Sequence, residues 1–241
     1  MEKIRKHLAF WVSLCWLAGQ IYIAFVPVQG MVIKPLHVGF ALLLVFLLKP
    51  FIKEKPLLSA FVDAVCFLTT FAFMAHIVLN SVRIVERIPF VDDLFYFDKF
   101  FALALVILLM EAGRRYLGWS MTIIAVIFML YSFFGRSLPG ILSHQGVDMI
   151  SFVENQVMTT GGIFSSPIAA SADTIFYFMI FGAFLAATPA GKLFVSIAKY
   201  ATRNSIGGPG KASILASGLF GMISGSAAAN VASVGVIAAI L

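Results

Sequence analysis

Charged residues are scarce in this chain. Only 12% of its 241 residues are Asp, Glu, Lys or Arg, whereas 61% are hydrophobic. Soluble domains carry about 25% charged residues, so this composition excludes an ordinary soluble domain. It predicts an all-α, polytopic protein of the lipid bilayer. The net charge of +6 gives no support to nucleic-acid binding, because the basic residues stand between apolar segments and form no single patch.

Residues that form disulfides or bind metals are scarce as well. Cys15 and Cys66 both lie inside apolar runs, so no disulfide framework is indicated. His7, His37 and His144 stand apart without ligand spacing, and we expect neither a histidine metal site nor a cofactor. The apolar run after the basic amino terminus lacks a small-x-small cleavage site, so we expect it to be a retained span.

Six apolar segments are predicted to cross the ~30 Å hydrocarbon core of a membrane, and the fourth has the weakest signal because its continuous apolar core extends only from Phe100 to Met110. They cover residues 8–28, 34–52, 57–79, 98–113, 117–135 and 171–189. With the amino terminus in the cytoplasm, twelve Lys and Arg residues fall inside and five outside. This count agrees with the positive-inside rule.

Three connecting segments combine apolar and charged residues at helical spacing, which predicts amphipathic interfacial helices; the alternative is loops packed on the protein. These segments are residues 81–98, 147–157 and 192–203. The composition changes near Glu111–Trp119, from Leu, Phe and Val to Gly, Ser, Ala and Thr. We therefore expect a four-helix scaffold over residues 1–115 and transport machinery over residues 116–241, because small residues let helices approach closely.

The last thirty residues, Ala212 to Leu241, carry no charged side chain, and Ser224-Gly225-Ser226 interrupts them. One unbroken helix of this length would measure about 45 Å, more than the ~30 Å core. A break exposes peptide groups, which a membrane tolerates only where protein or a water-filled cavity satisfies them. The pattern predicts a re-entrant helical hairpin over about residues 210–241, with a substrate or ion site at its break.

Neutral oxygen atoms gather around this break. They belong to Ser217, Ser224, Ser226, Asn230 and Ser233, with backbone carbonyls freed at Gly225. A cage of this kind at Ser224, Ser226 and Asn230 suits a sodium ion, and opened helix ends favour an anionic substrate. The alternative is helix packing through small residues, which needs no ligand.

Two other glycine-bearing stretches have weaker signals. Residues 207–211 lack the preceding strand and the spacing of a phosphate-binding loop, so they predict a turn with Pro209 in the first turn of the next helix. Residues 159–167 either line the transport path or form a loop that ends at Pro167.

Four ionisable groups lie in predicted spans near an interface. They are Asp63, His76, Glu111 and Asp173. A charge at the bilayer centre costs at least ~2.5 kcal/mol, which makes each one a functional candidate. Because all four lie near an interface, we expect pairing between helices or snorkelling rather than proton relay.

The run from Gly207 to Asn230 resembles the large permease subunit of tripartite ATP-independent periplasmic (TRAP) transporters. The likeness is to the fused form, which joins a four-helix small subunit to the twelve-helix large one. Supporting segments are Glu111–Arg115, Phe134–Leu142, Gly162–Phe164 and Phe181–Phe184. The resemblance covers the chain from about residue 100 onward, and before that it rests on the number of spans.

The resemblance implies sodium-coupled symport of organic acids, commonly carboxylates, with a periplasmic solute-binding protein and no covalent catalysis. It places the chain in the cytoplasmic (inner) membrane of a bacterium or archaeon, and it places Ser224, Gly225, Ser226 and Asn230 in the first hairpin. Because Leu241 follows soon after, we expect the amino-terminal part of a permease, without the second repeat that alternating access needs.

Two rival functions come from different classes. An intramembrane serine hydrolase would use Ser224 or Ser226, but it needs a base at similar depth, and the nearest intramembrane histidine in sequence is His76. The other rival is a membrane scaffold or accessory subunit that does not itself transport.

Overall fold

The computed structural model describes residues 2–52, 54–188 and 190–224. These residues are mainly helical and contain no strand, as the sequence predicts. The chain divides into two compact units, Met1–Ala169 (unit 1) and Ala170–Leu241 (unit 2). Five helices of the described part are long and apolar enough to cross a membrane. The protein is therefore an all-helical, multi-pass membrane protein.

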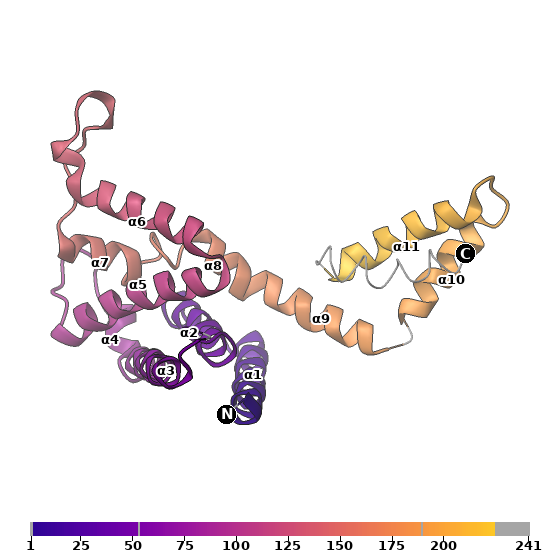
Figure 1. Cartoon of the computed structure of the whole chain (residues 1–241), viewed down its shortest axis with the longest axis horizontal. Helices are drawn as coiled ribbons and strands as arrows, with labels where there is room; N and C mark the ends of the chain where they lie inside the picture. The colour runs from indigo at the N-terminus through magenta and orange to yellow at the C-terminus, as the bar shows by residue number, and fades with distance from the viewer. Residues whose placement is uncertain (1, 53, 189, 225–241) are drawn as a thin grey trace. The chain divides into compact units, whose positions relative to one another are not determined.

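Unit 1 is built from five long helices and several short ones (Figure 1). The long helices are α1 (Glu2–Phe25), α2 (Gly30–Leu48), α3 (Pro56–Leu79), α5 (Tyr96–Tyr116) and α6 (Trp119–Phe134). The short helices are α4 (Ser81–Glu86), η1 (Gly135–Ser137), η2 (Gly140–Leu142), α7 (Met149–Val157) and α8 (Ser166–Ala170). The five long helices match the first five predicted spans within a few residues at most ends, because length and hydropathy are local properties of the sequence. Helix α5, the fourth predicted span, is not among the helices apolar enough to cross a membrane, since charged residues lie at both of its ends.

The core of unit 1 lies where α2, α3, α5 and α7 meet. Phe46, Phe73, Leu105 and Val157 are almost completely buried there, and each comes from a different helix. Helix α2 packs on both α1 and α3, while α5 packs on α2, α3, α6 and α7. Gly39 permits the closest approach of α2 and α3, since a Cβ at this position would collide with the Met74 side chain.

The predicted amphipathic segments are helical, although less of the first one is helical than expected. In that segment Ser81–Glu86 forms α4, the residues after it are not helical, and its last three residues belong to α5. Helix α7 buries Phe152, Val153 and Glu154 and packs on α5, so its apolar face covers the protein. The third segment forms α10 (Ala190–Thr202).

Unit 2 contains a π-helix, η3 (Ser171–Ile175), followed by α9 (Phe176–Ala187), α10 and α11 (Gly208–Ser224). The apolar helical run Ser166–Phe184 corresponds to the sixth predicted span. Helices α10 and α11 pack together, and α11 also contacts α9. Helix α11 covers the first part of the range predicted for the re-entrant hairpin; the rest lies outside the described residues, so the hairpin stays a prediction.

We expect α7 to lose stability in acid through its amino-terminal cap, Asp148. The Asp148 carboxylate accepts hydrogen bonds from the backbone N–H groups of Ile150 and Ser151. The side chain of Ser151 has the largest effect on the pKa of Asp148, which its hydrogen bond lowers. The hydrogen bond from the Ser151 backbone lowers this pKa further. A lowered folded pKa gives stability above the unfolded value of about 3.9, and this stability is lost as the pH falls through the folded value.

Hydrogen exchange of the α7 amides, corrected for intrinsic rates, measures this effect. Protection should fall with acid in the natural chain but not in Asp148→Asn, because Asn caps helices without titrating. Equal acid sensitivity in both chains would contradict the assignment.

Candidate functional site

The predicted site residues lie on and just after α11. Ser217 is partly buried on this helix. Ser224 is its last residue, and Gly225, Ser226 and Asn230 lie outside the described residues. The sodium and substrate contacts of these residues therefore stay predictions, and the structure describes how α11 approaches them.

A tight turn joins α10 to α11. Gly207 has φ +74°, a left-handed conformation that favours glycine. The Thr202 carbonyl accepts a hydrogen bond from the Ser205 N–H (3.0 Å), and a Cβ at Gly208 would lie 2.9 Å from the same oxygen. Pro209 lies in the first turn of α11. The predicted turn is confirmed.

Small residues line the contact between α10 and α11. Ala198, Ala212 and Ala216 are almost completely buried, and the last two are four residues apart on one face of α11. The Thr202 hydroxyl donates to the Ala198 carbonyl (2.8 Å), so this buried polar group is satisfied within α10. Small-residue packing thus holds the first half of α11, ahead of the predicted break.

The glycine-bearing stretch at residues 159–167 is a packed loop in unit 1. The Ile163 N–H donates to the Gln156 carbonyl, and a Cβ at Gly162 would collide with the backbone of the last turn of α7. Phe164 is completely buried, and its carbonyl accepts a hydrogen bond from Lys34 Nζ (2.9 Å). Of the two interpretations, the geometry favours the loop, with Pro167 as the second residue of α8.

One end of unit 1, which we call the basic end, carries an ion-pair network. Asp63 of α3 binds Arg5 of α1 (2.7 Å) and Arg115 of α5 (2.6 Å). Glu111 accepts hydrogen bonds from Arg114 (2.8 Å) and Arg115 (2.6 Å). Three helices that are far apart in the sequence are joined by these contacts.

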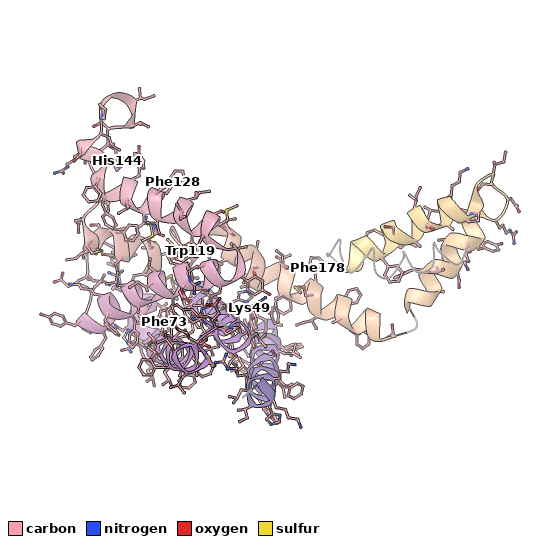
Figure 2. The ribbon with its side chains drawn as sticks, in the orientation of Figure 1. Lys49, Phe73, Trp119, Phe128, His144 and Phe178 are labelled. Atoms are coloured by element: carbon pink, nitrogen blue, oxygen red, sulfur yellow. The ribbon has the colours of Figure 1, made fainter. Side chains whose placement is uncertain are left out.

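Figure 2 shows Lys49 and Trp119 toward the basic end and His144 toward the other end of unit 1. At that opposite end, Asp98 of α5 binds His76 Nε2 (2.8 Å) and both terminal nitrogens of Arg83 (2.7 and 2.8 Å). Hydrogen bonding to Asp98 raises the pKa of the Arg83 guanidinium. Asp63 and His76 are therefore paired between helices, as predicted. Glu111 instead pairs within its own helix, and Asp173 is exposed in η3.

A buried ion pair at the opposite end was not predicted. Arg87 Nη1 lies 2.7 Å from Glu154 Oε1, and the two side chains are only 6% and 8% exposed. The Phe90 N–H donates to the same carboxylate oxygen. One feature of the sequence indicated that Glu154 is buried, since this residue lies beside Val153 and Val157 on the predicted apolar face of its helix.

Nothing in the described residues supports the serine hydrolase alternative, because Ser224 ends α11 and Ser226 lies outside them. Within the described ranges, no group of three or more His, Cys, Asp or Glu residues could hold a metal ion. Apolar helices of spanning length, with charges paired at both ends of unit 1, define a multi-pass membrane protein.

Comparison with known protein families identifies which one. Residues 104–239, more than half of the chain, match the DctM component of tripartite ATP-independent periplasmic transporters. The chain belongs to this family, which is a transporter component and not an enzyme. No curated protein and no solved structure matches the chain. The predicted boundary between residues 115 and 116 stays a prediction.

Removal of one partner of the Arg87–Glu154 pair should destabilise unit 1 strongly. Glu154→Ala leaves a buried, unpaired guanidinium, which costs about 3–5 kcal/mol. The double variant Arg87→Met/Glu154→Met removes both charges and should recover most of the lost stability. Thermal unfolding in detergent measures both. Equal melting temperatures for the single variant and the natural chain would contradict burial of the pair.

Gly208→Ala should loosen the contact between α10 and α11. The added methyl group would meet the Thr202 carbonyl, so either the turn or the last turn of α10 must shift. Gly218→Ala on the same helix is the matched control, because nothing lies within 4 Å of its added Cβ and alanine favours helix by about 1 kcal/mol. Hydrogen exchange across both helices should rise in the first variant only.

Proposed function

We propose that this chain acts in a sodium-coupled TRAP permease that imports organic acids with a periplasmic solute-binding protein. The observation that carries the proposal is the family match, which extends through the Ser224–Asn230 break. Sodium, carboxylate substrates and the binding protein go beyond the match itself, and the chemistry of the residues supports them as follows.

Sodium coupling follows from the residue types at the break. Ser224, Ser226 and Asn230 supply neutral oxygens, and a hard cation prefers oxygen ligands. A cage without carboxylates keeps the full charge of the bound ion. That charge, with the positive ends of opened helices, would attract a carboxylate to the same place. Sodium would therefore bind first and hold the substrate.

The position of α11 fits this role. Its first half is held on α10 by Ala212 and Ala216, so the hairpin limb has a fixed base. The predicted break follows eight residues after Ala216, at Ser224. Ser217, next to Ala216 and partly buried, would line the approach to the ion.

The ion-pair networks support the proposed orientation. Arg5, Arg114 and Arg115 meet at the basic end of unit 1, which we place in the cytoplasm with the amino terminus, in the inner membrane of a bacterium or archaeon. The opposite end, with Arg83 and Arg87, would then face the periplasm and the solute-binding protein. Residues 1–115 would brace the transport part.

Sodium-dependent uptake by the whole permease in proteoliposomes, with its binding protein, tests the proposal. Asn230→Ala and Ser226→Ala should each raise the sodium concentration for half-maximal uptake about tenfold or more, because each removes a hydrogen-bonding or coordinating group from a charged ligand. Ser213→Ala is the matched control on α11, where the hydroxyl bonds only to the Pro209 carbonyl.

If Asn230→Ala and Ser226→Ala both keep the natural sodium dependence at normal expression, the assignment of the sodium site to these residues is refuted. The chain would then be left with a scaffold role. Uptake that is independent of sodium in the natural protein would refute the coupling ion while leaving the transport role in place.

A further inference from the structure

A groove of about 360 Å³ runs between α1 and α3 at the basic end of unit 1. Its floor comes from the last turns of α2, and its walls come from the first turns of α1 and from α3 between Ala60 and Leu68. The apolar lining consists of Ile4, Leu8, Phe46, Leu47, Ala60, Ala64, Phe67 and Leu68. Both outer helices pack on α2, which leaves the space above it open.

Small residues hollow one wall of this groove. Ala60 and Ala64 are four residues apart and therefore lie on one face of α3. From Ala60 to Leu68 the wall extends about 12 Å along the helix. One leaflet of the hydrocarbon core is about 15 Å thick. The groove therefore has the length and the apolar surface to take one acyl chain of a lipid in the adjoining leaflet.

The groove ends at charged groups. Arg5 Nη2 lies 2.7 Å from Asp63 Oδ2, and this contact bridges α1 and α3. Asp63 is only 5% exposed and also accepts hydrogen bonds from Arg115, the Ser59 hydroxyl and the Phe51 N–H, so its own charge is fully compensated. Arg5 is 26% exposed, and a guanidinium has five N–H donors. Its remaining donors therefore lie at the polar end of the groove.

The positive charge at this end of the groove favours an anionic lipid headgroup. Lys3 is exposed two residues away in the first turn of α1, where it adds positive charge to this end of unit 1 without lining the groove. Basic residues next to an apolar groove attract anionic lipid headgroups, whereas a zwitterionic headgroup gains little from them. We propose that this groove binds one anionic phospholipid, with an acyl chain along Ala60–Leu68 and its phosphate on Arg5. The lipid would fasten α1 to α3 where the two helices do not pack closely.

Native mass spectrometry of the purified full chain with added phosphatidylglycerol or phosphatidylcholine tests this site. Ala64→Leu fills the groove and should weaken phosphatidylglycerol binding about tenfold or more, because several methylenes lose their contacts at about 0.8 kcal/mol each. Ala72→Leu is the matched control, with the same change at an exposed position of α3 outside the groove. It should bind lipid as the natural chain does.

Arg5→Gln separates headgroup from chain. It should reduce the preference for phosphatidylglycerol over phosphatidylcholine about fivefold, the effect of one basic residue, while an acyl chain still binds. Circular dichroism and thermal unfolding check that each variant is folded, and Ala64→Leu carries the test if Arg5→Gln is not.

Three results would overturn the proposal. Equal retention of the two lipids by the natural chain would indicate annular lipid only. Equal losses in Ala64→Leu and Ala72→Leu would place the lipid elsewhere. A change in oligomer mass with Ala64→Leu, at constant lipid count, would show that the groove seats a second copy of the chain.

Discussion

A charge or peptide group inside a membrane must find a partner within the protein, and unit 1 is arranged around this requirement. Asp63, Asp98 and Glu111 each accept hydrogen bonds from at least one arginine, and Asp98 also binds His76. The partners of Asp63 and Asp98 come from other helices, so satisfying these carboxylates also fixes the register of α1, α3, α4 and α5 at both ends of the bundle. Apolar packing between the two ends is less directional and could not specify that register alone.

The same requirement acts on the backbone in unit 2. The turn from α10 to α11 uses Gly207 for its left-handed conformation, and the Thr202 carbonyl accepts the Ser205 N–H. Ala212 and Ala216 then allow α11 to approach α10 closely, so that half of the helix needs no ligand. Gly225 and the residues after it lie outside the described part of the chain, so the ion site proposed there rests on residue types and on the family match.

Properties that depend on a short stretch of sequence were predicted well. The spans follow from hydrophobic length, the turn before Pro209 follows from its glycines, and α7 follows from helical periodicity. Partners distant in the sequence were not predictable, because composition does not say which charge meets Glu154 or which carbonyl meets Lys34. Periodicity likewise identifies an apolar face without saying whether protein or lipid covers it. The Ser224–Asn230 site lies outside the described residues and stays a prediction.

Two contacts connect the first hundred residues to the part of the chain that matches the family. The match begins at residue 104, inside α5, so Lys34 and Arg87 precede it. Their partners, the Phe164 carbonyl and Glu154, lie within the match. A buried ion pair cannot separate without leaving a bare charge in a low-dielectric interior. The helices before residue 104 and the family region as far as Ala169 therefore share one core and form a single frame. The glycine-bearing loop before α8 contributes to this frame, because Lys34 of α2 donates a hydrogen bond to its Phe164 carbonyl.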